Sequence, residues 1–254
     1  MNKINQGIIL FKMNRSLLSD YFSENQTKTE FRNCDSWVIL SPIELSIKQK
    51  IEAIGTPLKD WDVQINYGIK TGFNEAFIID GEKRAELIAA DPKCAEIIRP
   101  ILRGRDIKRY TYEFADLYII ATFPAKHYNI DDYPAIKAHL LSYGIERLEQ
   151  TGKEYTINGE KIKARKKTNN QWFETQDSIS YWDDFNKQKI VWKRIGSILR
   201  FCYDDTGCMG LDSTCFATGK HIKYLLAVLN SLIGHYLLKD SPQTGTGDLL
   251  ISVQ

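Results

Sequence analysis

The chain has 254 residues, of which 43% are hydrophobic and 26% charged, and 34 Lys and Arg against 32 Asp and Glu leave a formal net charge of +2. These proportions fit a globular protein and exclude a low-complexity or collagen-like chain. No apolar run approaches the roughly 18 residues of a transmembrane helix, and the N-terminus has no signal-peptide pattern. We therefore expect a cytoplasmic protein.

The first strong structural signal lies after residue 40. Residues 1–36 carry few signals and are expected to form a strand and turn, or a connector from something upstream. Ser41, Pro42 and Glu44 then match a capping box with proline at the first helical position, which predicts the start of a helix. Isoleucines at helical spacing continue the pattern until Gly55, where we expect the helix to end.

The middle of the chain mixes short strands with helices. Alternating residues predict a strand over 61–69, and the apolar segment 74–80 is expected to be a second strand, in a hairpin or a strand–loop–strand unit. Residues 82–98 favour a helix interrupted at Pro92, and residues 117–122 a buried strand.

The second half begins with a helical pattern and becomes rich in strands. The polar, basic segment 151–170 is expected to be a surface hairpin or a mobile loop. A helix over 220–238 is apolar on much of its circumference, so we expect it deep in a core. The other predicted elements are a helical segment at 131–150 and strands at 189–193, 197–203, 211–217 and 249–253. This irregular order predicts a mixed α+β fold, with an irregular β-sheet core and several packed helices.

The motifs of several enzyme classes are missing. The sequence has no P-loop, no GxSxG, HExxH or Rossmann glycine motif, and no Asn/Asp-Pro-Pro-aromatic segment for holding a flipped base. The acids and lysines near residues 160–163 do not assemble a nuclease core, and five cysteines without a CxxC pair and four scattered histidines give no zinc spacing. We expect no catalytic residue, no metal and no cofactor in this chain.

Cations gather in two stretches of the chain. Five lie within residues 161–167 and five within residues 99–109, next to aromatic residues in both cases. Segregated cations can form a phosphate-binding face even on a nearly neutral protein. On charge alone, however, two solvated surface segments explain the pattern equally well.

Several short blocks resemble one known family, the TaqI-like C-terminal specificity domain. They occur in the family's order over about residues 37–254, at 67–79, 98–107, 172–174, 189–192 and 224–231. The resemblance implies the target-recognition domain of an adenine-N6 DNA methyltransferase or of an Eco57I-like type IIG restriction–modification enzyme. The partners would then be double-stranded DNA and the methyltransferase domain of the parent protein. That domain, expected upstream of Met1, would bind S-adenosylmethionine, and residues 1–36 would connect it to the specificity domain at 37–254.

The resemblance and the placement of cations on loop-like segments together predict the DNA-contacting residues. Gly68, Gly72 and Gly104 would let backbone approach phosphate closely, although tight turns need glycine just as well. The alternative function is a protein–protein docking module of a DNA-modification or phage-defence complex, with the last helix and residues 1–36 as its surface. The expected DNA-binding residues are Lys70, Thr71, Arg103, Arg105, Lys108, Arg109, Arg165, Lys166, Lys167, Asn169, Asn170, Lys193 and Arg194.

Overall fold

The computed structural model describes residues 15–25, 41–157, 159–238 and 249–250. The chain divides into two compact units, Met1–Asp60 and Trp61–Gln254. The domain boundary expected at residues 36–37 lies outside the described residues. Each unit is described by itself.

The first unit contains the helix that the capping box predicts. Helix α3 (Pro42–Ile54) begins where the Ser41 hydroxyl accepts a hydrogen bond from the Glu44 amide (3.3 Å) and the Glu44 carboxylate accepts one from the Ser41 amide (2.9 Å). The helix ends at Gly55, whose amide donates to the carbonyl of Ile51 at 2.7 Å. Within residues 1–36, Arg15–Asn25 form helix α2, where a strand and turn or a connector was expected. A 3-10 turn, η1 (Leu58–Asp60), follows α3.

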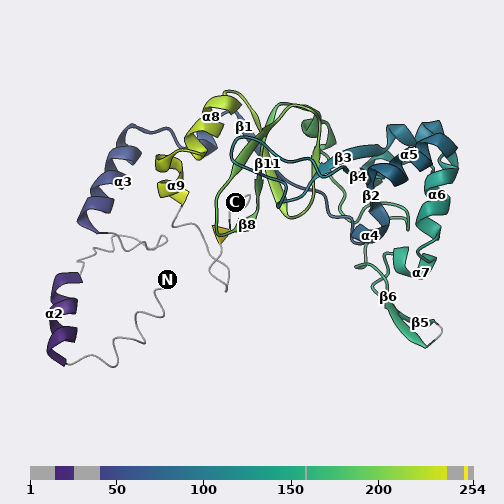
Figure 1. The fold of residues 1–254 in the computed structure, drawn as a ribbon, viewed down its shortest axis with the longest axis horizontal. Coiled ribbons are helices and arrows are strands. Elements are labelled where there is room, and N and C mark those ends of the chain that lie inside the picture. The colour runs from purple at the N-terminus through teal and green to yellow at the C-terminus, as the bar shows by residue number, and fades with distance from the viewer. Residues whose placement is uncertain (1–14, 26–40, 158, 239–248, 251–254) are drawn as a thin grey trace. The chain divides into compact units, whose positions relative to one another are not determined.

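Four antiparallel strands make the first sheet of the second unit (Figure 1). Their order across the sheet is β1 (Val63–Tyr67), β11 (Thr214–Gly219), β7 (Lys189–Lys193) and β9 (Phe201–Asp204). The alternation predicted over 61–69 is confirmed by β1, in which Ile65 lies opposite Ala217. The buried pattern of residues 189–192 places β7 inside the sheet, between β11 and β9.

The second sheet also has four strands, in the order β10 (Met209–Gly210), β3 (Ile98–Leu102), β4 (Leu117–Ile120) and β2 (Ile78–Asp80). Strand β10 runs parallel to β3, and the other pairs are antiparallel. Strands β9, β10 and β11 follow one another in the chain but alternate between the two sheets, so this segment joins the sheets. Two strand pairs complete the unit, β5 (Glu154–Ile157) with β6 (Glu160–Lys163) and β8 (Ile195–Gly196) with β12 (Leu249–Leu250).

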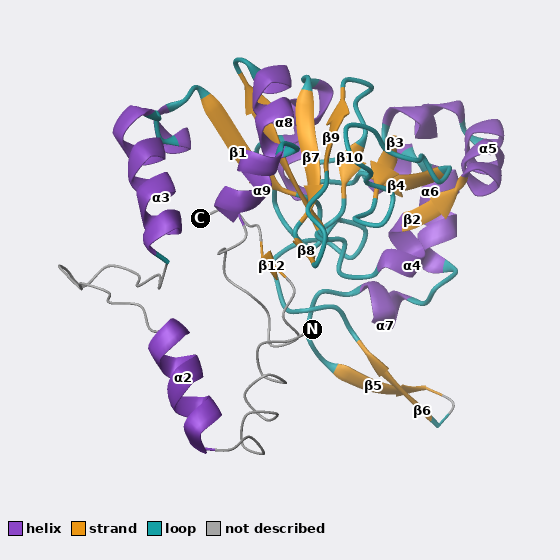
Figure 2. Cartoon of the chain, turned by 60° about the vertical axis from the view of Figure 1, so that its left-hand side comes forward, coloured by secondary structure: helices purple, strands orange, loops and turns teal. Residues whose placement is uncertain are grey.

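The helices of this unit cover the two sheets separately. Figures 1 and 2 both show α5 and α6 beside the second sheet and α8 beside the first. The α-helices are α4 (Asn74–Phe77), α5 (Gly81–Ala90), α6 (Pro134–Leu141), α7 (Ile145–Leu148), α8 (Ile222–Leu229) and α9 (Leu232–Leu238). The 3-10 turns are η2 (Pro92–Glu96), η3 (Pro124–Lys126), η4 (Ile130–Asp132) and η5 (Trp182–Asn186).

Three apolar clusters hold the unit together. One joins α5 and α6 to the second sheet, and another joins α8 to the first sheet. The third contains Ile101 and Ile119 of the second sheet together with Val191 and Phe216 of the first. Because this cluster is shared, the two sheets form one body and the loops between them have defined positions.

The mixed α+β class is confirmed, but further expected elements differ from the structure. Of the strand expected at 74–80, only residues 78–80 form one, β2, because residues 74–77 form the short helix α4. Strands β1 and β2 belong to different sheets, so no hairpin joins them. The last helix is broken at Asn230, whose side chain exchanges hydrogen bonds with the amide and carbonyl of Phe201. Beyond the break, α9 buries Gly234 but leaves Leu232 89% exposed, so it lies at the surface rather than deep in a core.

Within the described part of the chain, no helix is long and apolar enough to cross a membrane.

Candidate nucleic-acid interface

Loops from distant parts of the sequence meet around a turn between β10 and β11. At this turn, the Asp212 amide donates to the Ile69 carbonyl at 2.9 Å. The Ser213 carbonyl accepts from the Arg194 amide at 2.9 Å, and its hydroxyl accepts from the Gly104 amide at 3.4 Å. Three segments that carry predicted DNA-binding residues, around residues 70, 104 and 194, are therefore held together by hydrogen bonds to one turn.

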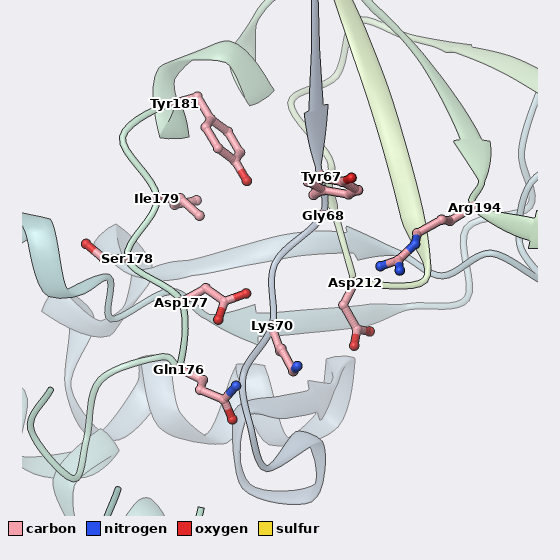
Figure 3. Close-up of a pocket in the computed structure, with 10 residues that line it drawn as sticks. All are labelled: Tyr67, Gly68, Lys70, Gln176, Asp177, Ser178, Ile179, Tyr181, Arg194 and Asp212. Atoms are coloured by element: carbon pink, nitrogen blue, oxygen red, sulfur yellow. The ribbon is translucent and has the colours of Figure 1, made fainter. Parts of the chain in front are cut away.

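A cavity of about 480 Å³, here called the central cavity, opens beside this turn. The amides of Gln176 and Asp177 both donate to the carbonyl of Lys70, at 3.1 and 3.3 Å, and so fix its second wall. Figure 3 shows the Asp177 carboxylate and the Lys70 ammonium pointing into the space, whereas the Ser178 hydroxyl points away from it. The lining residues are Tyr67, Gly68, Lys70, Gln176, Asp177, Ser178, Ile179, Tyr181, Arg194 and Asp212.

Besides Lys70, Arg194 and Tyr181 also present hydrogen-bond donors to the central cavity. The guanidinium carbon of Arg194 lies 5.4 Å from the centre of the Tyr67 ring, and Arg194 Nε is buried without a hydrogen-bond partner among the described residues. Burial and the nearby charge of Asp177 raise the pKa of Tyr181 to about 12. The Tyr181 hydroxyl therefore stays protonated at neutral pH.

A second cavity, of about 290 Å³, lies at the end of β7 and is called the β8 cavity. Its cations are Arg105, Lys193 and Arg200, and none of its lining residues is acidic. Gly104 packs so closely here that a Cβ atom on it would lie 2.8 Å from Cγ of Lys193. Lys193 is the last residue of β7, and Arg194 forms the bend that follows it. Lys193 lines this cavity, and Arg194 lines the central one.

A third cavity, of about 350 Å³, lies at the base of the β5–β6 hairpin and is called the hairpin cavity. It too has no acidic lining residue, and its solvent-facing cations are Arg147, Lys161, Lys163 and Lys166. Gly72 lines this cavity. A Cβ atom on Gly72 would lie 2.7 Å from Oε1 of Gln176, a residue in the wall of the central cavity. The two cavities are therefore neighbours across the turn at Gly72.

Two of the predicted DNA-binding residues serve the interior of the protein. The buried guanidinium of Arg165 donates to four carbonyl groups at 2.6–2.9 Å, those of Thr71, Leu148, Trp172 and Glu174. Burial lowers the pKa of Arg165 to about 10, against the opposing effect of Glu174. Thr71 is only 1% exposed, and its hydroxyl donates to the Asn74 side chain at 2.6 Å.

Several other predicted residues are paired within the protein. The guanidinium of Arg103 binds both carboxylate oxygens of Asp106, at 3.0 and 2.8 Å. The other pairs are Lys108 with Glu113 at 3.1 Å, Arg109 with the Asn230 carbonyl at 2.6 Å, and the Asn170 amide with the carbonyls of Thr175 and Gln176 at 3.2 and 2.9 Å. Lys167 and Asn169 are exposed but line none of the three cavities.

The structure thus brings together five solvent-accessible residues of the predicted set: Lys70, Arg105, Lys166, Lys193 and Arg194. It adds Arg147 and Arg200, isolated cations that carry no local signal, and Lys161 and Lys163 from the basic stretch. DNA contact by any of these residues stays a prediction.

The glycines have structural roles that the sequence left open. A Cβ atom on Gly68 would lie 1.8 Å from the carbonyl oxygen of Leu211, so this glycine permits two protein backbones to approach each other. Gly72 has φ +79°, a left-handed conformation that favours glycine. The described residues also contain no group of three or more His, Cys, Asp and Glu side chains placed to hold a metal ion.

Comparisons with known proteins give a family match and likenesses to solved structures. Residues 99–248 match the family described as the TaqI-like C-terminal specificity domain. Among solved structures, the Type IIL restriction-modification enzyme MmeI in complex with DNA is similar at a TM-score of 0.48 and 11% sequence identity. That likeness covers 78% of this chain and 24% of the enzyme, so the chain spans about a quarter of its length. No curated protein matches the sequence.

Proposed function

This chain belongs to the family of TaqI-like C-terminal specificity domains, and we propose that it recognises a specific sequence of double-stranded DNA. Domains of this family supply DNA recognition in restriction–modification systems. The observation that supports the proposal is the convergence of cations from separate segments on the three cavities, where Lys70, Arg105 and Lys166 are exposed to solvent. Lysine and arginine side chains on loops can contact phosphates, and a rigidly held arginine can also read guanine.

The test uses the 254-residue chain and a pool of duplexes with a randomised central segment. We expect the chain to enrich a defined sequence and to bind it with an affinity that falls steeply as salt is raised, because bound phosphates release counterions. An alanine variant of the exposed Lys70 should bind more weakly. Failure of the chain to bind or enrich any duplex, even at low ionic strength, would rule the proposal out.

The parent enzyme is the second part of the proposal. In our proposal the domain directs an adenine-N6 DNA methyltransferase, alone or fused to an endonuclease as in type IIG enzymes, in the cytoplasm. S-adenosylmethionine would then bind in the methyltransferase domain and not in these residues. The amino-acid sequence upstream of Met1 tests this, since an Asn-Pro-Pro-Tyr-like segment is expected there and its absence would count against adenine methylation.

A second candidate function is docking to a protein partner, such as the catalytic domain. Helix α9 favours it because Leu232, Ile233 and Leu237 are 89, 61 and 47% exposed, and contiguous exposed apolar residues often mark interaction sites. If docking were the chain's sole role, charge reversal at Arg105 and Lys166 would leave the sequence preference of the assembled enzyme unchanged. A changed preference would favour DNA recognition instead.

A further inference from the structure

The three cavities differ in the sign of the charges that line them. The β8 cavity and the hairpin cavity are lined by cations and by no carboxylate. The central cavity contains Lys70 and Arg194, but it also contains the carboxylates of Asp177 and Asp212. All four of these side chains are solvent-accessible to some degree.

The two carboxylates are not used to hold the fold. Among the described residues, neither the Asp177 nor the Asp212 side chain takes part in an ion pair or hydrogen bond, whereas the buried carboxylates of Asp106 and Asp204 do. Their backbones, by contrast, are fixed. The Asp212 amide bonds to residue 69 and the Asp177 amide to residue 70, so the carboxylates stand on opposite sides of one short segment. Figure 3 shows both beside the Lys70 ammonium.

Carboxylates are unsuited to phosphate, since two negative groups repel each other. In the major groove of DNA, the hydrogen-bond donors that a carboxylate can accept from are the amino groups N4 of cytosine and N6 of adenine. Lysine and arginine supply the complementary donors, which suit O6 and N7 of guanine. A cavity with both kinds of group therefore matches base edges, whereas a purely cationic cavity matches phosphates.

We propose that the central cavity reads base identity, with Asp177 and Asp212 accepting hydrogen bonds from the exocyclic amino groups of adenine or cytosine. The β8 cavity and the hairpin cavity hold phosphates on either side of it. This inference rests on the proposed function. It assigns the sequence specificity to Asp177 and Asp212, whose negative charges oppose non-specific binding to phosphates. Removing at least one of the two carboxylates should weaken discrimination between bases while leaving the affinity for unrelated duplexes equal or higher.

The experiment compares the full chain with its Asp177→Ala and Asp212→Ala variants. Asp183→Ala is the matched control, because Asp183 is exposed and lines none of the three cavities. Each protein is used to select from randomised duplexes and is then titrated with the wild-type selected duplex and with a scrambled one. Thermal unfolding of each variant checks that its fold is intact.

We expect the duplexes selected by the wild-type chain to show adenine or cytosine at one position or more. Which of the two bases is selected tells whether the carboxylate accepts from N6 of adenine or from N4 of cytosine. At least one cavity variant should lose about tenfold in discrimination at such a position, without weaker binding to the scrambled duplex. The Asp183→Ala control should select as the wild type does.

Three outcomes separate this inference from the function on which it rests. If the chain selects a sequence and both cavity variants keep the same preference at every position, base reading by these carboxylates is wrong and DNA recognition stands. If the cavity variants bind the selected and the scrambled duplex more weakly by the same factor, base reading by these carboxylates is contradicted in the same way. If the wild-type chain binds no duplex, the proposed function fails, and the inference fails with it.

Discussion

The ammonium group of Lys189 donates a hydrogen bond to the carboxylate of Asp204 in the interior of the second unit, where their side chains are 1 and 0% exposed. The same ammonium donates to the Phe185 carbonyl at 2.5 Å. The second carboxylate oxygen of Asp204 accepts from the hydroxyls of Tyr112 at 3.0 Å and Thr206 at 2.6 Å. Both charges are therefore fully compensated, and the pair links β7 to β9 across one edge of the first sheet.

Replacing one partner of this pair should destabilise the fold strongly. Lys189→Met leaves the Asp204 carboxylate buried without its counter-charge, a change worth about 3–5 kcal/mol. Urea unfolding of the whole chain measures it. The control is Lys220→Met, because Lys220 and its partner Asp62 are 76 and 69% exposed, so its unfolding midpoint should match that of the wild type. Equal midpoints for the two variants would contradict a structural role for the buried pair.

The same pair should make the fold sensitive to acid. Burial raises the pKa of Asp204, but the charge of Lys189 and the hydrogen bonds from Lys189 and Thr206 outweigh it and hold the pKa below its usual value. A carboxyl group whose pKa is lower in the folded than in the unfolded state stabilises the fold. This contribution is complete above the pKa of the unfolded state, about 4, and is lost as the pH falls through the pKa of the folded state. We expect the free energy of unfolding to fall below about pH 4, and less steeply for Asp204→Asn. Parallel pH profiles for the two proteins would disprove this.

Arg165 and Lys166 are neighbours in sequence but should respond oppositely to mutation. Arg165→Lys keeps the charge but cannot reproduce the hydrogen bonds to four carbonyl groups, so the melting temperature should fall by several degrees. Lys166→Ala removes an exposed charge from the hairpin cavity, so DNA affinity should fall while the melting temperature stays the same. Thermal unfolding and DNA titration of both variants check this. A fully stable Arg165→Lys variant would show that the guanidinium is dispensable inside the protein.

The hairpin cavity should contribute to the salt dependence of DNA binding. If Lys163 and Lys166 each contact a phosphate, the double alanine variant should reduce the slope of log affinity against log salt by about 2. The preferred sequence should not change, because phosphate contacts carry no base information. Titrations at four or more salt concentrations measure the slope, with Lys220→Ala as the control. A slope equal to that of the wild type would place the DNA elsewhere.

Two glycines should differ in what an added methyl group disturbs. In Gly68→Ala the new Cβ meets the Leu211 carbonyl oxygen at 1.8 Å, and backbone cannot move aside, so the loss of stability should exceed about 3 kcal/mol. In Gly104→Ala the obstacle is the side chain of Lys193, at 2.8 Å, which can rotate away. That variant should lose about 1 kcal/mol or less, and its DNA affinity should fall because Lys193 is displaced. Chemical unfolding ranks the two, and a reversed order would contradict the contacts described.

Local signals predicted those parts of the fold that depend on local interactions. The capping box of Ser41 and Glu44 and the alternation in residues 61–69 both correspond to elements of the structure. The short helix at Asn74–Phe77 was missed because four apolar and polar residues do not show a period. The break at Asn230 was missed because its cause is a hydrogen bond to Phe201, 29 residues away.

The candidate site could be predicted only in part for the same reason. Clustered cations pointed to Arg105 and Lys166, both of which line cavities. Arg147 and Arg200 stand alone in the sequence, and only the folded structure shows that they line these cavities. Arg165 looks like its basic neighbours, and only the positions of distant carbonyl groups reveal that it faces inward.

The walls of the central cavity are held by main-chain hydrogen bonds, from residues 176, 177 and 212 to residues 69 and 70. The exposed side chains of Lys70, Asp177 and Asp212 project from those walls and take part in no ion pair or hydrogen bond among the described residues. Substitutions at Lys70, Asp177 or Asp212 can therefore change the chemistry of the cavity while its frame survives. Such a separation makes the cavity a natural place for relatives to diverge, and a practical place to introduce new preferences by mutation.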